Sequence, residues 1–341
     1  MFKTKLSIIV AVIMLLSLLP AQVAYGAAGE VGGSFTSGNV APTITSVEVI
    51  PAAGGSAVTS MTPGTSYKAK IVAGDANTVD DIDQVRVAIV FDSSDSDPTA
   101  DPGETGNTTI LACLKWVKSG DTWSISPNSD TTWSLTSGSC TKPTDMSSST
   151  GTWEFYFTIG KVATEGTGGS SQAGWDLFGE VKDEGTPAEA WDDRDLAMEW
   201  YGEIGTPSPA SIDWSTVSLG TGFAEDTNEK GPISITYIAN GNYDQKVKTT
   251  ATWTGAPSGT ATLDPSGTCS SANQFALKAD DTATLPIDGL VTTGGVSIDD
   301  TGTQTGESGS TEANNTLWLK LASVFSNATY TGTITYTIEN K

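Results

Sequence analysis

The chain has 341 residues and a formal net charge of −23, with 40 acidic and 17 basic residues. This balance disfavours nucleic acid and anionic membranes as partners, because both are bound through clustered lysine and arginine. The absence of histidine excludes Ser-His-Asp triads, Cys-His pairs and histidine-ligated zinc. The acidity favours solubility and is compatible with divalent cations as partners.

The N-terminal residues have the pattern of an export signal. Lys3 and Lys5 precede an apolar run from Leu6 to Leu19, and Ala24-Tyr25-Gly26 offers small residues to a signal peptidase. The run is shorter than the ~20 residues of a bilayer-spanning helix. We therefore expect residues 1–26 to be a signal peptide, with a retained membrane anchor as the weaker alternative. Since the C-terminus reads as a strand without a sorting tail, we expect an extracellular or cell-surface chain with no membrane insertion after cleavage.

Residues 27–42 show neither a helical nor a strand period and are expected to form a flexible arm. After them come short segments rich in β-branched and aromatic residues, separated by Gly, Pro, Asp and Ser. These segments predict strands at 44–50, 67–72, 85–91, 110–117, 123–126, 153–159, 175–181 and 196–204. Short strands at this spacing predict a β-sandwich.

One hairpin in this region can be placed in register. Residues 118–121, Lys-Ser-Gly-Asp, form a favourable turn. Closing that turn pairs Val117 with Thr122 and Trp116 with Trp123. Facing indoles of this kind stabilise a sheet by ~0.2–1 kcal/mol.

A proline-containing segment at residues 205–210 is the expected linker, because two prolines prevent a continuous strand. Further strands are predicted at 214–219, 233–238, 247–253, 261–263, 275–277, 317–321 and 330–338. The expected fold class is all-β: two tandem Ig-like or jelly-roll β-sandwich domains, residues 43–204 and 211–341, after a signal peptide.

Two short stretches resemble strands of known surface proteins. Residues 315–320 and 328–335 are similar to the end of sandwich domains in prokaryotic surface proteins, where a Tyr-x-Gly-x-Ile/Leu strand completes the sheet. Residues 41–47 resemble the first strand of Ig-like modules in archaeal and bacterial surface-layer, pilus and adhesin chains. Because these families are structural or adhesive, the resemblance implies such a role for this chain.

The loop after the predicted strand 67–72 carries the candidate metal ligands. Oxygen-bearing side chains follow closely there, at Asp75, Asn77, Asp80, Asp81 and Asp83. Calcium takes six to eight oxygen ligands, so the loop predicts a Ca²⁺ site. The alternative is an ordinary turn in which Asp and Asn bond to the backbone. A second acidic loop, residues 92–104, fails the EF-hand pattern and is expected to be solvated.

Cysteines and sequons suggest covalent modification of an exported chain. Cys113 and Cys140 fall in one predicted domain and are expected to form a disulfide. Cys269 is then a buried thiol or an intermolecular link. Three asparagines open Asn-x-Ser/Thr sequons for glycosylation: Asn107, Asn314 and Asn327.

The leading functional hypothesis is a non-enzymatic structural or adhesive subunit of a surface layer, filament or matrix. The arm at residues 27–42 either joins copies by adding a strand to a neighbour's sheet or is a disordered leader. Ten tryptophans make a carbohydrate-binding module the runner-up, with core packing as their other explanation. A carboxylate-dependent glycoside hydrolase comes third. Expected partners are copies of the chain, other surface proteins or glycans.

Overall fold

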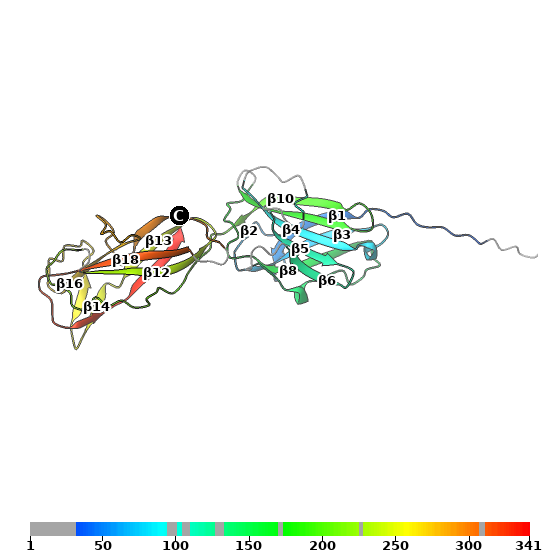
Figure 1. The fold of residues 1–341 in the computed structure, drawn as a ribbon. Coiled ribbons are helices and arrows are strands. Elements are labelled where there is room, and N and C mark those ends of the chain that lie inside the picture. The colour runs from blue at the N-terminus through cyan, green and yellow to red at the C-terminus, as the bar shows by residue number, and fades with distance from the viewer. Residues whose placement is uncertain are drawn as a thin grey trace, which may run out of the picture. The chain divides into compact units, whose positions relative to one another are not determined.

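The computed structural model describes residues 32–93, 101–103, 110–126, 133–169, 173–224, 228–306 and 311–341. These residues form an all-β fold with two short 3₁₀ turns, η1 (Val79–Asp81) and η2 (Ser137–Ser139) (Figure 1). None of their helical turns is long and apolar enough to cross a membrane. The expected signal peptide lies outside the described residues. Residues 32–42 form neither helix nor strand, and residues 39–341 make up one compact unit.

Two sheets are built from residues 43–198. The four-stranded sheet has the order β1 (Thr43–Pro51), β3 (Ser66–Gly74), β8 (Thr150–Thr158) and β7 (Ser134–Leu135). The six-stranded sheet has the order β2 (Ser60–Met61), β10 (Ala188–Met198), β9 (Gly174–Lys182), β4 (Gln84–Asp92), β5 (Ile110–Val117) and β6 (Thr122–Ser126). Neighbouring strands are antiparallel except β2 and β10.

The two sheets face each other across an apolar core. Along β3, buried residues alternate with half-buried ones from Tyr67 to Ala73, the two-residue period of a strand with one face inward. Trp116 of β5 meets Trp153 of β8 across the core, with ring centroids 5.8 Å apart. The first half of the chain is therefore sandwich-like.

The predicted hairpin register is confirmed. Val117 pairs with Thr122 and Trp116 with Trp123, and the two indole centroids lie 6.2 Å apart. Gly120 and Asp121 both have positive φ, which explains glycine at the first position and a short polar residue at the second. Asp121 also accepts a hydrogen bond from Trp116 Nε1 at 2.8 Å.

Residues 202–340 form two further sheets. The seven-stranded sheet has the order β11 (Gly202–Ile204), β12 (Glu229–Ala239), β18 (Thr311–Leu321), β16 (Gln274–Asp280), β15 (Thr260–Leu263), β14 (Thr252–Ala256) and β19 (Thr329–Thr331). The three-stranded sheet has the order β17 (Val296–Gly302), β13 (Tyr243–Thr249) and β20 (Ile334–Asn340). A second apolar cluster draws on both sheets and includes Tyr237, Val247, Phe275 and Tyr336.

Several predicted strands differ from the observed ones. Residues 214–219 form no strand, β17 was not predicted, and the segment 196–204 is divided between β10 and β11. The alternating segment 330–338 is also divided, because the chain leaves the seven-stranded sheet at β19 and joins the three-stranded one at β20. Gly332 sits at this crossing, where a Cβ would lie 2.0 Å from Trp253 Cδ1. Only glycine fits so close to the indole.

The expected linker at residues 205–210 continues along β12. Gly205 N donates to Thr236 O and Ser208 N to Ser234 O, each at 2.8 Å. These bonds extend the edge of the seven-stranded sheet beyond β11. The division of the chain into two domains stays a prediction.

Candidate functional site

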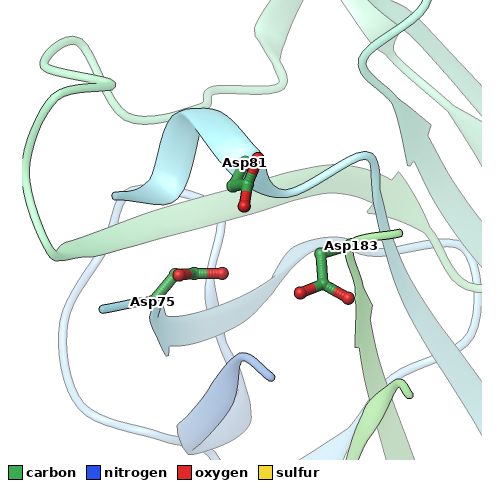
Figure 2. A group of neighbouring side chains, drawn as sticks. All are labelled: Asp75, Asp81 and Asp183. Carbon is green, nitrogen blue, oxygen red and sulfur yellow. The ribbon is translucent and has the colours of Figure 1, made fainter. Parts of the chain in front are cut away.

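Three carboxylates from separate parts of the sequence converge beside the first pair of sheets. Asp75 follows β3, Asp81 ends η1 and Asp183 follows β9. One oxygen from each lies within 4.8 Å of the other two. Figure 2 shows the three side chains directed toward a common space.

Strand pairing explains this convergence. β4 and β9 are antiparallel, with Gln84 opposite Lys182, and Asp83 N donates to Lys182 O at 2.8 Å. This pairing brings the start of Asp183's loop beside the residues that follow η1. Asp75 is fixed from the other sheet, since its backbone N donates to Ser149 O at 2.9 Å.

Asp75 is buried with only part of its carboxylate satisfied. Its side chain is 3% exposed, and its Oδ1 accepts a hydrogen bond from Asn77 N at 2.6 Å. Its Oδ2 is buried and has no hydrogen-bond partner among the described residues. Burial raises the pKa of Asp75, and the charges of Asp81 and Asp183 raise it further, against the lowering effect of the Asn77 N–H.

The other two carboxylates differ in exposure. Asp183 is 1% exposed; its Oδ1 accepts from Gly185 N at 2.6 Å and its Oδ2 from Asn39 Nδ2 at 2.9 Å. Asp81 is exposed. The cluster therefore has two buried carboxylates, one beside each sheet, and a third that is open to solvent. This arrangement suits a hydrated divalent cation.

The structure gathers part of the predicted ligand set and adds a residue that the sequence did not reveal. Asp75 and Asp81 belong to the cluster, whereas Asp80 and Asp83 do not. Asp80 lies beside Lys118, with 3.4 Å between Oδ1 and Nζ. Asn77 Oδ1 accepts from Val40 N at 2.8 Å. Asp183 was missed because only the pairing of β4 with β9 brings it near.

A second acidic group already holds a cationic side chain. Asp101, Glu180 and Glu189 lie close together, and the buried Arg86 reaches Asp101 at 2.7 Å and Glu180 at 3.0 Å. The guanidinium also lies over Phe178, 5.1 Å from the ring centroid. Because arginine supplies the balancing charge, this group is the weaker candidate for a metal.

The expected disulfide is not present: neither Cys113 nor Cys140 forms a disulfide. Cys113 packs with Ala88 and Phe178 on the side of the six-stranded sheet away from the core. Cys140 lies beside the four-stranded sheet, where its Sγ accepts a hydrogen bond from Tyr156 N at 3.3 Å. Packed sheets are about 10 Å apart, too far for a disulfide, whose Cα atoms lie within about 7 Å. Cys269 is buried and free.

Two of the three predicted glycosylation sites are accessible. Asn314 and Asn327 are exposed, and Asn314 Oδ1 accepts from Ser234 Oγ at 2.7 Å. Asn107 lies outside the described residues.

The tryptophans contribute mainly to the interior. Six are buried and four are half-buried. The half-buried ones are Trp123, Trp191, Trp200 and Trp214. The indoles therefore serve mostly core packing, and the half-buried ones are those in contact with solvent.

A large groove opens along the apolar face of the seven-stranded sheet. Its volume is about 1160 Å³, and it is lined by Ile233, Phe275 and Leu319 of the sheet and by Ile334 and Tyr336 of β20. Residues 210–217 and Leu219, which form no strand, line another part of the groove. Among the described strands β20 pairs only with β13, so its other edge is unpaired where Ile334 and Tyr336 border the groove.

A comparison of the sequence with protein-family models and with curated proteins found no match.

Proposed function

We propose that the chain is a structural or adhesive subunit of an extracellular surface, built from Ig-like or jelly-roll sandwiches. In this proposal the N-terminal arm, residues 27–42, enters the groove of a second copy and adds a strand to β20. The observation that carries it is the groove of about 1160 Å³, which has apolar side chains of the sheet along its floor and lies beside the unpaired edge of β20. An unpaired strand edge is a template for another chain.

The arm has the length and the chemistry for this role. β20 has seven residues, so a strand beside it spans about 23 Å at ~3.3 Å per residue. The arm, residues 27–42, exceeds that length and leaves residues to reach the neighbour. Phe35 is 95% exposed, and burial of such a side chain is worth about 1.5–3 kcal/mol. The groove offers that burial.

The first test compares two equally exposed apolar side chains. Phe35→Ser removes the aromatic anchor of the arm, whereas Ile287→Ser changes a side chain that is also 95% exposed but lies outside the arm. Phe35→Ser should abolish filaments or lattices seen by electron microscopy, while Ile287→Ser leaves them intact. Equal assembly by both variants would contradict strand addition.

The second test supplies the arm as a separate molecule. A fluorescent peptide of residues 27–42 should bind the Phe35→Ser protein, with binding measured by fluorescence anisotropy. The same peptide carrying Ser at position 35 is the matched control and should bind much more weakly. If both peptides bind alike or neither binds, the groove is not the acceptor.

A carbohydrate-binding module is the alternative, supported by the half-buried Trp214 in the groove wall. Glycan-array binding that Trp214→Ala abolishes, by a protein that never assembles, would favour it over the structural role.

A further inference from the structure

We propose that Asp75, Asp81 and Asp183 bind one calcium ion, with Asp183 taking the place of the more local ligands that the sequence suggested. The site joins the β3 loop, η1 and the β9 loop. This inference is independent of the assembly proposed above.

The spacing of the oxygens matches a calcium shell. Calcium binds oxygens at about 2.4 Å, so two ligands on opposite sides of the ion are about 4.8 Å apart and adjacent ligands are closer. The three carboxylate oxygens lie within 4.8 Å of one another. A single ion placed between them can therefore contact all three after small movements of the side chains.

Asp75 supplies the second observation that points to a ligand. Its Oδ2 is buried and lacks a hydrogen-bond partner among the described residues, and its carboxylate is directed toward the space shared with Asp81 and Asp183 (Figure 2). A buried carboxylate oxygen without a partner is costly, because the charged group loses water and gains nothing in return. A cation between the three side chains provides the missing partner.

No side-chain cation of the described residues fills this role. The nearby basic side chains pair with other carboxylates: Lys118 with Asp80, and Arg86 with Asp101 and Glu180. The Asp101 group thus serves as an internal comparison, since the same number of carboxylates is balanced there by a guanidinium. The Asp75 cluster also has three carboxylates, and no ion pair of the described residues joins a lysine or arginine to them.

Calcium suits the site better than magnesium does. The ligands come from three separate segments, and calcium accepts irregular geometry with six to eight oxygens, whereas magnesium requires a near-ideal octahedron at about 2.0–2.1 Å. The exposed Asp81 leaves one side open, through which water completes the shell. An extracellular module with few protein ligands is expected to bind calcium with a Kd of about 10⁻⁴–10⁻³ M.

Isothermal titration of the chain with calcium chloride and with magnesium chloride tests the site. The unchanged protein should bind calcium and show at least tenfold weaker binding of magnesium. Asp81→Asn and Asp75→Asn should each reduce the calcium stoichiometry by one. Asp80→Asn, which alters the neighbouring exposed acid outside the cluster, should leave the stoichiometry unchanged.

Circular dichroism verifies that each variant is folded, and Asp81→Asn serves as the main variant because its side chain is exposed. The proposal is overturned if the protein fails to bind calcium at 5 mM, if Asp81→Asn keeps full stoichiometry, or if Asp80→Asn loses as much as Asp81→Asn. Repeating the titration on Phe35→Ser separates the two proposals, because calcium binding should persist there even where assembly fails.

Discussion

Asp75→Asn should make the protein more stable than the unchanged protein when calcium is absent, and less stable than it when calcium is bound. The carboxylates of Asp75 and Asp183 are both buried, and their nearest oxygens are within 4.8 Å. Two unit charges at this distance repel by ~3.5 kcal/mol at an effective dielectric constant of 20. The amide of Asn removes that repulsion and can donate to Asp183, while its oxygen still accepts from Asn77 N.

Part of this gain is offset, because the hydrogen bond from Asn77 becomes a neutral one, which is worth ~1 kcal/mol less. Without calcium, Asp75→Asn should therefore raise the free energy of unfolding by about 1–3 kcal/mol. With calcium 100-fold above its Kd, the unchanged protein gains about 2.7 kcal/mol and the variant gains nothing from this site. The two stability curves should cross as calcium increases.

Urea denaturation followed by tryptophan fluorescence, in EDTA and in calcium, measures both differences. The pKa of Asp75 is raised above its ordinary value of 3.8, so the folded state binds the proton more tightly than the unfolded state does. The unchanged protein in EDTA should thus become relatively more stable as pH falls through this raised pKa, and the advantage of the variant should shrink. A variant that is less stable than the unchanged protein in EDTA at pH 7 would refute the reasoning.

Three further changes have expected outcomes. Arg86→Met should lower the free energy of unfolding by about 3–5 kcal/mol in urea denaturation, because it leaves the buried Glu180 without its cation; a loss below 1 kcal/mol would contradict this role. Trp116→Ala should cost about 3–5 kcal/mol in the same assay, since the side chain is 1% exposed; a neutral result would argue against the sheet-to-sheet core. Alkylation of the denatured, unreduced protein, followed by mass spectrometry, should label both Cys113 and Cys140, and protection of the pair would show a disulfide.

The sequence pattern predicted strands correctly where residues close together in the sequence determine the pairing. The hairpin around residues 118–121 was placed in register because its turn residues and facing tryptophans lie close in sequence. The prediction for 214–219 was wrong, because Trp214 and Val217 line the groove from an irregular segment instead of pairing in a sheet. Apolar spacing reports which side chains are covered, and a covered segment need not have hydrogen-bonded strand neighbours.

In the candidate site too, the sequence pattern did not reveal which residues distant in the sequence come together. Asp75 and Asp81 were identifiable because they share one loop, whereas Asp183 is placed by the β4–β9 register. The signal that could have found it is its position directly after the predicted strand 175–181, just as Asp75 follows the predicted strand 67–72. The disulfide prediction was wrong for a related reason: membership of one region does not tell which face of a sheet a cysteine occupies.

The hydrogen bonds of Asn39 and Val40 also determine which loops first bear a pulling force applied to the N-terminal residues. Asn39 Nδ2 donates to Asp183, and Val40 N donates to Asn77, so tension on the preceding residues reaches the loops after β9 and β3 before it reaches β1. An ion shared by Asp75 and Asp183 would oppose the separation of those loops. The force needed to peel the N-terminal segment away should then increase with calcium, which single-molecule pulling can measure.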